Sequence, residues 1–390
     1  MSEHDDGGPI FGAPPEPAPE APAAPRRRRR KSALPGYLAM LIALAVVAVV
    51  GYVGVTRGID TVKDRFGGPD DFAAGAATGS VTFEVSAGES VTTVGQNLES
   101  AGVVASVQAF SDAVDASGRS IQVGVFPLQK KMAAGDVVAV LVDAGNRLSS
   151  LTLLPGKTTD EIIALLAKDT DYSKADYDKV LTSKSLDLPQ GARGSAEGYL
   201  FPDQYLIAPD ATAQDILQMM VDRFVDTATE VDLAGAAERL GYTQHQLVTI
   251  ASLLQAEVPT KLMPKVARVI YNRLEIDPNP TAGFLQIDAS VNYALGRGPI
   301  TRLTLADIDS VADSPYNTYR QKGLPPGPIE APGASALEAA GNPVKGPWFF
   351  YVTTNLKTQK TKFTADYQEF LRYSDELDLY CATESASGCG

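Results

Sequence analysis

An uninterrupted apolar stretch near the N-terminus constrains this chain more than any other feature. Residues 32–56 carry no charged side chain, and the run from Leu38 to Val55 is almost wholly apolar. At ~1.5 Å per residue, about 20 such residues cross the ~30 Å hydrocarbon core of a bilayer. The basic residues Arg26 to Lys31 directly precede the run, and the positive-inside rule assigns that flank to the cytoplasm. The sequence therefore predicts one transmembrane helix over 36–56.

Two other interpretations of the apolar run are weaker. A cleaved signal peptide is disfavoured because more than 30 residues precede the run and no small-x-small cleavage site follows it directly. A buried core helix is disfavoured because a Pro-rich tail and a hydrophilic linker flank the run and offer it no core. We therefore expect a single-pass protein of the cell (cytoplasmic) membrane, with a cytoplasmic N-terminus and nearly all its folded mass outside the cytoplasm.

Three segments lack the pattern of a folded domain. Residues 1–35 are rich in Pro, Ala and charged side chains and are predicted to be a disordered cytoplasmic tail. Residues 57–79 show no periodicity and predict a linker, which at ~3.3–3.6 Å per residue reaches at most about 80 Å. Residues 376–390 predict a flexible tail. It contains both cysteines of the chain, Cys381 and Cys389, and the sequence leaves their pairing open.

Composition excludes several classes of function. A net charge of -13 argues against nucleic acid as a partner, because phosphate binding needs a basic face. The chain has only two histidines, His4 and His245, so a cluster of histidine ligands for a metal is not available. A Ser-His-Asp triad could rest only on His245. We expect no metal and no cofactor.

Residues 80–148 predict a small α+β module. Val81, Phe83 and Val85 alternate as in a strand, and a helix with Ser90 as its N-cap follows. Helices are also expected over 107–114 and 132–142. Core packing alone explains the apolar positions of this module, so we assign no catalysis to it.

A helix over residues 243–257 carries an unusual carboxyl group. Thr243 is a suitable N-cap, and Leu247, Ile250 and Leu254 follow at helical spacing. Glu257 lies three residues after Leu254, so its side chain falls on the same apolar face. A glutamate on an inward face is uncommon, because burying an unpaired charge is costly.

Two interpretations of Glu257 remain open. In the structural one, it pairs with Arg268 or Arg273 of the next helix. In the functional one, partial burial raises its pKa and equips it to donate a proton near neutral pH. Spacing alone slightly favours the structural interpretation.

After a Pro-initiated helix (MPKVARVIYNRLEI), the sequence loses its regularity. Three polar, Gly- and Pro-rich segments follow: FLQIDASVNYALG, SPYNTYRQKGLPPGPIEAPG and GNPVKGPWFFYV. Long ordered loops of this kind often form binding sites, although rigid turns would explain them as well. Tyr316, Asn317 and Tyr319 would suit a carbohydrate, since they offer aromatic faces and amide hydrogen bonds.

These motifs resemble those of the MltG (YceG-like) family of membrane-anchored endolytic lytic transglycosylases, which cut nascent peptidoglycan strands. The resemblance covers about Val81 to Tyr373. Each motif is short, but their order and spacing are specific. They are EGYLFPDQY (197–205), IASLLQAEV (250–258), YNRL (271–274), LQID (285–288), SPYNTY (314–319), GLPPGPI (323–329), APG (331–333) and NPVK (342–345).

The resemblance implies an α+β fold with a single N-terminal transmembrane helix. It implies a LysM-like subdomain over 80–148 and a catalytic domain with long ordered loops over 149–375. Peptidoglycan strands and the cytoplasmic membrane are the implied partners, together with nearby peptidoglycan synthases. The family often has a histidine in its closing segment, where this chain has Phe370, so no role is carried over for that segment.

The resemblance also assigns roles in the site. Glu257 ends the ASLLQAE segment and matches the catalytic acid/base. Glu197, Asp203 and Asp288 lie in matching motifs, and each is favoured as a hydrogen-bonding or framework group over a second catalytic carboxylate. The candidate substrate-binding residues are Glu197, Gln286, Asp288, Asn317 and Tyr319.

One glutamate suffices for a lytic transglycosylase, which would cleave the MurNAc-GlcNAc β-1,4 bond and leave 1,6-anhydroMurNAc ends. A hydrolytic muramidase and a non-catalytic peptidoglycan-binding scaffold are the alternatives; in the scaffold, the module at 80–148 would be the binding part.

Overall fold

The computed structural model describes residues 70–298 and 303–384, which form two compact units. We call 70–152 with 204–216 the N-terminal unit, and 153–203 with the remaining described residues from 217 onward the C-terminal unit. Each unit has its own hydrophobic core. The described chain combines helices with two-stranded antiparallel sheets, so the predicted α+β class is confirmed.

The N-terminal unit contains two small sheets and a group of short helices. In chain order its elements are β1 (Thr78–Val85), α2 (Val91–Ser100), α3 (Val107–Ser117), β2 (Gly124–Lys130), α4 (Ala134–Leu141), η1 (Ala144–Asn146), β3 (Ser149–Thr152), β4 (Gln204–Ile207) and the start of α7 (Ala213–Glu230).

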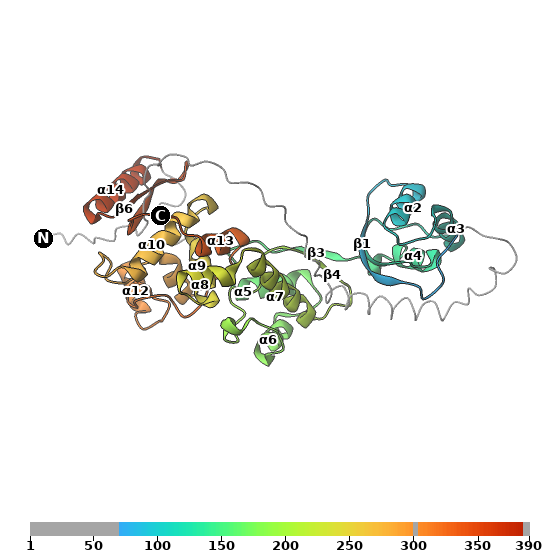
Figure 1. The fold of residues 1–390 in the computed structure, drawn as a ribbon, viewed down its shortest axis with the longest axis horizontal. Coiled ribbons are helices and arrows are strands. Elements are labelled where there is room, and N and C mark those ends of the chain that lie inside the picture. The colour runs from blue at the N-terminus through green and yellow to red at the C-terminus, as the bar shows by residue number, and fades with distance from the viewer. Residues whose placement is uncertain (1–69, 299–302, 385–390) are drawn as a thin grey trace. The chain divides into compact units, whose positions relative to one another are not determined.

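The core of the N-terminal unit lies between the β1–β2 pair and the helices α2, α3 and α4 (Figure 1). Phe83 pairs with Phe126 across the two antiparallel strands, and both rings are buried. As predicted, Val85 is buried on the same strand face as Phe83, and Ser90 caps α2 by accepting a hydrogen bond from the Thr93 N–H at 3.1 Å. The second pair, β3 with β4, joins segments about 50 residues apart.

The C-terminal unit is mainly helical. Its elements are α5 (Thr159–Asp169), α6 (Lys174–Ser183), η2 (Gln190–Ala192), the rest of α7, α8 (Leu233–Leu240), α9 (Gln244–Glu257), η3 (Thr260–Leu262), α10 (Met263–Glu275), α11 (Asp288–Ala294), α12 (Leu305–Ser310), α13 (Ala334–Gly341), β5 (Phe350–Asn355), β6 (Lys360–Thr364) and α14 (Tyr367–Glu384).

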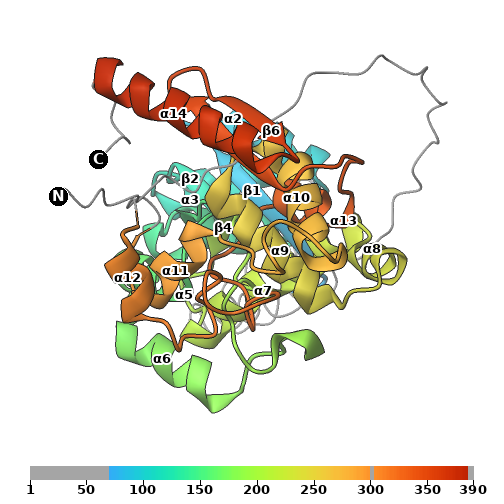
Figure 2. The same ribbon diagram turned by 90° about the vertical axis from the view of Figure 1, so that its left-hand side faces the viewer.

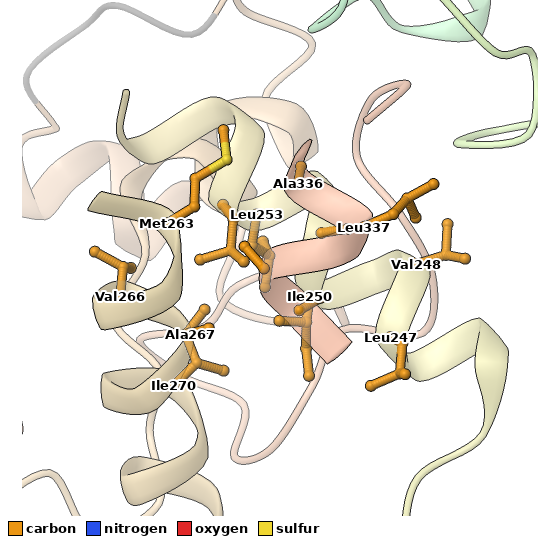
Figure 3. Packing of buried hydrophobic residues seen from close by; sticks show 14 of the residues in the cluster. Leu247, Val248, Ile250, Leu253, Met263, Val266, Ala267, Ile270, Ala336 and Leu337 are labelled. Atoms are coloured by element: carbon orange, nitrogen blue, oxygen red, sulfur yellow. The ribbon is translucent and has the colours of Figure 1, made fainter. Parts of the chain in front are cut away.

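Helix α9 is the centre of this unit. Thr243 begins it with a capping box, in which its side chain accepts from the Gln246 N–H and the Gln246 side chain accepts from the Thr243 N–H. Every residue from Leu247 to Leu254 is buried. A helix that is apolar on all sides belongs in a core, and α8, α10, α11 and α13 all pack against α9. Figure 3 shows its apolar side chains against those of α10 and α13.

The two neighbours α10 and α13 are also joined by a hydrogen bond. The Tyr271 hydroxyl, buried in the core, donates to the Ala340 carbonyl at 2.7 Å. Pro264 lies in the first turn of α10, where its missing N–H is not needed. This confirms the Pro-initiated helix predicted from the sequence.

The β5–β6 hairpin and α14 form the C-terminal part of the unit. Figure 2 shows α14 along the hairpin, where Leu377 and Val352 form a small cluster with aromatic neighbours. Tyr351 of β5 points the other way, into the main core around α9. The hairpin therefore delivers two side chains, Tyr351 and Phe363, to the main core of the unit.

Three helices lie where the sequence indicated only irregular loops. α11, α12 and α13 span six to eight residues each, too short for an apolar repeat to stand out among Gly and Pro residues. At the C-terminus, residues 376–384, assigned above to a flexible tail, are the last turns of α14. Cys381 on this helix is disulfide-bonded, and Cys389 lies outside the described residues.

The expected membrane segment also lies outside the described residues, as do the N-terminal tail and residues 57–69 of the linker. Among the described helices, none has both the length and the apolar character needed to cross a bilayer. The end of the predicted linker belongs to the N-terminal unit, because the Asp71 side chain accepts a hydrogen bond from the Ala134 N–H at 3.0 Å and β1 begins at Thr78.

Replacing Leu253 by alanine should destabilise the C-terminal unit by about 2–5 kcal/mol, because it leaves a cavity beneath α10 and α13. Leu253 has no exposed surface. Trp348, the only tryptophan of the chain, packs against this core, so its fluorescence in a urea titration reports the change. The matched control Leu305→Ala removes a side chain that is 54% exposed and should cost less than about 0.5 kcal/mol. Equal losses from both variants would contradict the central role of α9.

Candidate active site

Glu257 is the last residue of the buried helix α9, and the chain turns into extended conformation at Val258. Its side chain is half-buried. The Tyr351 hydroxyl donates to Glu257 Oε2 at 2.9 Å, and the Ala289 N–H of α11 lies 3.5 Å from Oε1. Three separate elements, α9, α11 and β5, thus fix one carboxyl group.

Burial raises the pKa of Glu257 above its ordinary value. The hydrogen bonds from Tyr351 and Ala289 and the nearby charge of Arg273 oppose this effect, because each stabilises the ionised form. Burial is the largest of these causes, so the group retains its proton to a higher pH than a solvated glutamate. This is the property required of a general acid near neutral pH.

The arginines proposed as ion-pair partners of Glu257 are used elsewhere in the described part of the chain. Arg273 is buried on α10 and donates to the carbonyls of Phe349, at 2.8 Å, and of Leu285. Arg268 donates to the Val344 carbonyl and lies 3.7 Å from Glu275. The structural interpretation, in which an arginine pairs with Glu257, is therefore wrong. Arg273 instead holds two loops at the site while its charge acts on Glu257 without contact.

Asp288 is a second buried carboxyl group beside Glu257. It is the first residue of α11, and the Tyr319 hydroxyl donates to its Oδ1 at 2.7 Å. Burial and the nearby charge of Glu257 raise the pKa of Asp288 to about 7, although the bond from Tyr319 opposes the shift. Two of the predicted site residues, Asp288 and Tyr319, are thus brought together as a hydrogen-bonded pair.

Glu197 is the third carboxyl group of the site and is half-buried. Its Oε1 accepts from the Thr159 N–H at the start of α5 at 3.0 Å, and its Oε2 accepts from the Tyr293 hydroxyl at 3.3 Å. Burial raises the pKa of Glu197 to about 7. Gly198 beside it has a φ of +81°, and a Cβ there would lie 2.5 Å from Pro328. The turn that carries Glu197 therefore fits closely against the GLPPGPI loop.

Each of these carboxyl groups accepts a hydrogen bond from a tyrosine: Glu257 from Tyr351, Asp288 from Tyr319, and Glu197 from Tyr293. A tyrosine hydroxyl is neutral at pH 7, so it orients a carboxyl group without forcing it to ionise. The charge on one group raises the pKa of the next, as Glu257 does for Asp288. The arrangement can therefore hold protons on buried carboxyl groups at neutral pH.

The other two predicted substrate-binding residues differ in their surroundings. Gln286 is half-buried and has a positive φ of 51°, with its N–H bonded to the Thr318 carbonyl. Asn317 has no exposed surface, and its amide donates to the Ile308 and Val311 carbonyls and accepts from the Tyr319 N–H. The geometry makes Asn317 a framework residue that holds the loop carrying Tyr319.

Two other polar residues have structural partners. His245, near the start of α9, bonds through Nδ1 to the Tyr199 hydroxyl and through Nε2 to the Pro326 carbonyl, both at 2.8 Å. It thus ties the GLPPGPI loop to α9. Asp203 forms an ion pair with Arg223 at 2.6 Å.

Within residues 70–298 and 303–384, no group of three or more His, Cys, Asp or Glu side chains is arranged to hold a metal ion.

Reasoning from the sequence missed Tyr351, Tyr293 and Glu330. Glu330 is 5% exposed and lies near Glu197 and Glu257, whose charges contribute to raising its pKa to about 8, after the larger effect of burial. Tyr351 comes from a strand 94 residues after Glu257. No local spacing signals such a contact. The sequence offered one indication that Glu330 is unusual, namely its position as a charged residue inside the apolar segment GPIEAPG.

Comparison with known proteins identifies the family of this chain. The model of the YceG-like family matches residues 83–376. The endolytic murein transglycosylase of Bacillus subtilis is 30% identical over 294 residues, which cover 70% of this chain and 78% of that protein. The Streptococcus pneumoniae protein of the same name is 30% identical over 308 residues, 70% of this chain and 54% of that protein.

A solved structure is also similar. The crystal structure of a putative YceG-like protein from Listeria monocytogenes matches with a TM-score of 0.50 and 26% identity, over 75% of this chain and 98% of that one. The family match covers more than half of the chain and includes every carboxyl group described above. The chain therefore belongs to the YceG-like family.

Proposed function

We propose that this protein is an endolytic lytic transglycosylase that cleaves the MurNAc-GlcNAc β-1,4 bond of nascent peptidoglycan strands. The main support is Glu257, a carboxyl group held by three elements with a pKa raised by burial. The names of the relatives from B. subtilis and S. pneumoniae point to the same reaction class.

In the first step, protonated Glu257 gives its proton to the glycosidic oxygen. The bond from that oxygen to C1 of the N-acetylmuramyl residue breaks, and positive charge develops on the sugar ring. The hydrogen bond from Tyr351 to Oε2 of Glu257, at 2.9 Å, is much shorter than the one from Ala289 to Oε1, at 3.5 Å, so we assign the transferred proton to Oε1. The leaving strand departs with a free hydroxyl group, and Glu257 is left as a carboxylate.

In the second step, the Glu257 carboxylate takes the proton of the C6 hydroxyl of the same N-acetylmuramyl residue. The C6 oxygen attacks C1 and closes a 1,6-anhydro ring, which regenerates protonated Glu257 without consuming water. The attack is intramolecular, and a well-oriented intramolecular nucleophile can be worth about 7–11 kcal/mol. One carboxyl group can therefore serve both steps. Glu197, Gln286, Asp288 and Tyr319 are proposed to bind the saccharide.

A hydrolytic muramidase is the second candidate, and Asp288 is the observation in its favour. It is a second buried carboxyl group whose pKa, about 7, responds to the charge of Glu257. A hydrolase would use such a group to activate water or to attack C1. The two candidates differ in their products, since hydrolysis leaves reducing ends that carry an added water.

Mass spectrometry of digested, uncrosslinked glycan strands should show 1,6-anhydroMurNAc ends with the wild-type protein. Glu257→Gln should lower product release about 10²–10⁴-fold, the usual worth of a general acid. The control Glu275→Gln changes an exposed glutamate that also ends a helix, α10, and should be as active as wild type.

Three results would contradict the proposal. Reducing ends would support the muramidase, and full activity of Glu257→Gln would remove the catalytic role of that residue. Binding of strands without any product would support the scaffold, with the proposed LysM-like N-terminal unit as its binding part.

The pH profile of kcat/KM tests the state of Glu257 directly. Activity needs protonated Glu257, so it should fall as the pH rises through a pKa that burial has raised. Tyr351 lowers that pKa by stabilising the carboxylate. Tyr351→Phe should therefore move the alkaline limb to higher pH. Tyr242→Phe, which removes a hydroxyl bonded to Glu275, should leave it in place. If Tyr351→Phe left the alkaline limb in place, the limb would report the pKa of a group other than Glu257.

We also propose that residues 36–56 anchor the protein in the cytoplasmic membrane and keep Glu257 near the layer where new glycan strands emerge. This proposal rests on the apolar run and its basic flank. Peptidoglycan synthases would then be close neighbours. A secreted version lacking residues 1–56 should cut purified strands as well as the full chain but fail to replace it in cells. Equal function in cells would count against the anchor as a positional device.

A further inference from the structure

The segment 329–333 is held on both sides by hydrogen bonds. On one side, the Ile329 N–H donates to Ser252 Oγ at 3.1 Å and the Gly333 N–H donates to Gln255 Oε1 at 3.2 Å. Both acceptors belong to α9. On the other side, Ala331 exchanges backbone bonds with Gly156 and Lys157 at 3.0 and 2.8 Å. The segment is therefore fixed to the helix that carries Glu257.

Glu330 lies in the middle of this fixed segment and is 5% exposed. Its Oε1 is sealed from solvent, and within the described chain neither of its carboxyl oxygens has a hydrogen-bond partner. A methyl group at Gly156 would lie 3.5 Å from Oε1, which shows how closely the 155–157 turn covers that atom. A buried polar group without a partner is costly.

Two of the three charges around Glu330 belong to the site already described, and the third is Glu161, an exposed residue in the first turn of α5. After burial, the largest influences on its pKa are the carboxyl groups of Glu161, Glu197 and Glu257, and together these raise it to about 8. Glu330 is therefore mainly protonated at pH 7. A neutral carboxyl group offers one O–H donor and a carbonyl acceptor, which complement uncharged groups better than cations.

We propose that Glu330 is a further substrate-contacting residue of this site, whose Oε2, the carboxyl oxygen that is not sealed from solvent, forms a hydrogen bond with a hydroxyl or N-acetyl group of the saccharide. Two observations carry the inference: the nearly complete burial of a carboxyl group without any partner, and its attachment through Ser252 and Gln255 to the helix that ends in Glu257. The inference rests on the proposed function, because it takes the glycan strand as the ligand.

Kinetics on uncrosslinked glycan strands test this role. Glu330→Ala should raise KM about tenfold, the worth of one good hydrogen bond, and leave kcat within about twofold. Glu330→Gln keeps the shape, a donor and an acceptor, so its KM should stay within about threefold of wild type. Glu338→Ala, which removes an exposed glutamate of α13, is the control. Binding of the same strands in a Glu257→Gln background measures affinity without turnover.

The proposed function and the proposed Glu330 contact can fail independently in these experiments. Absence of anhydromuramyl products from the wild-type protein would refute the proposed function, whatever Glu330 does. Products from the wild-type protein with an unchanged KM and affinity in Glu330→Ala would refute the contact alone. Equal changes in Glu330→Ala and Glu330→Gln, accompanied by a lower Tm in both, would show a purely structural role and would also overturn the inference.

Discussion

The burial of helix α9 is the constraint on which the rest of the C-terminal unit depends. Its apolar side chains hold α8, α10, α11 and α13 around it. Its few polar side chains are equally important, since His245, Ser252 and Gln255 bind the GLPPGPI loop and the segment after it. Glu257 at its end is therefore fixed relative to these two segments and four helices. A shift of α9 would disturb every group of the site together.

Within residues 70–298 and 303–384, no cationic side chain directly contacts Glu257, Asp288 or Glu197. Glu257, Asp288 and Glu197 each accept a bond from a tyrosine hydroxyl, and the nearest arginine, Arg273, donates to backbone carbonyls. An arginine bonded to Glu257 would hold it ionised and remove its acidity. The neutral tyrosine hydroxyls orient the carboxyl groups, while burial and the repulsion between the groups raise their pKa values. Such a site suits proton transfer to a neutral substrate better than recognition of an anion.

The sequence predicted the parts of this site that are encoded locally. The spacing of Leu247, Ile250 and Leu254 located α9 and the inward position of Glu257, and the LQID and SPYNTY motifs led to Asp288 and Tyr319. It could not predict Tyr351, whose side chain enters the core around α9 from a distant strand, nor the shared surroundings of Glu330. It also suggested Asn317 as a sugar contact, because a sequence does not show that an amide is already fully bonded to backbone.

The contact between Tyr351 and Glu257 gives the chain a built-in order of assembly. During synthesis from the N-terminus, α9 is complete before β5, because Tyr351 lies 94 residues after Glu257. Until the hairpin docks, Glu257 lacks the donor that orients Oε2. The Phe349 carbonyl that fixes Arg273 is missing for the same period. Full orientation of Glu257 therefore requires that the chain be present and folded as far as β5.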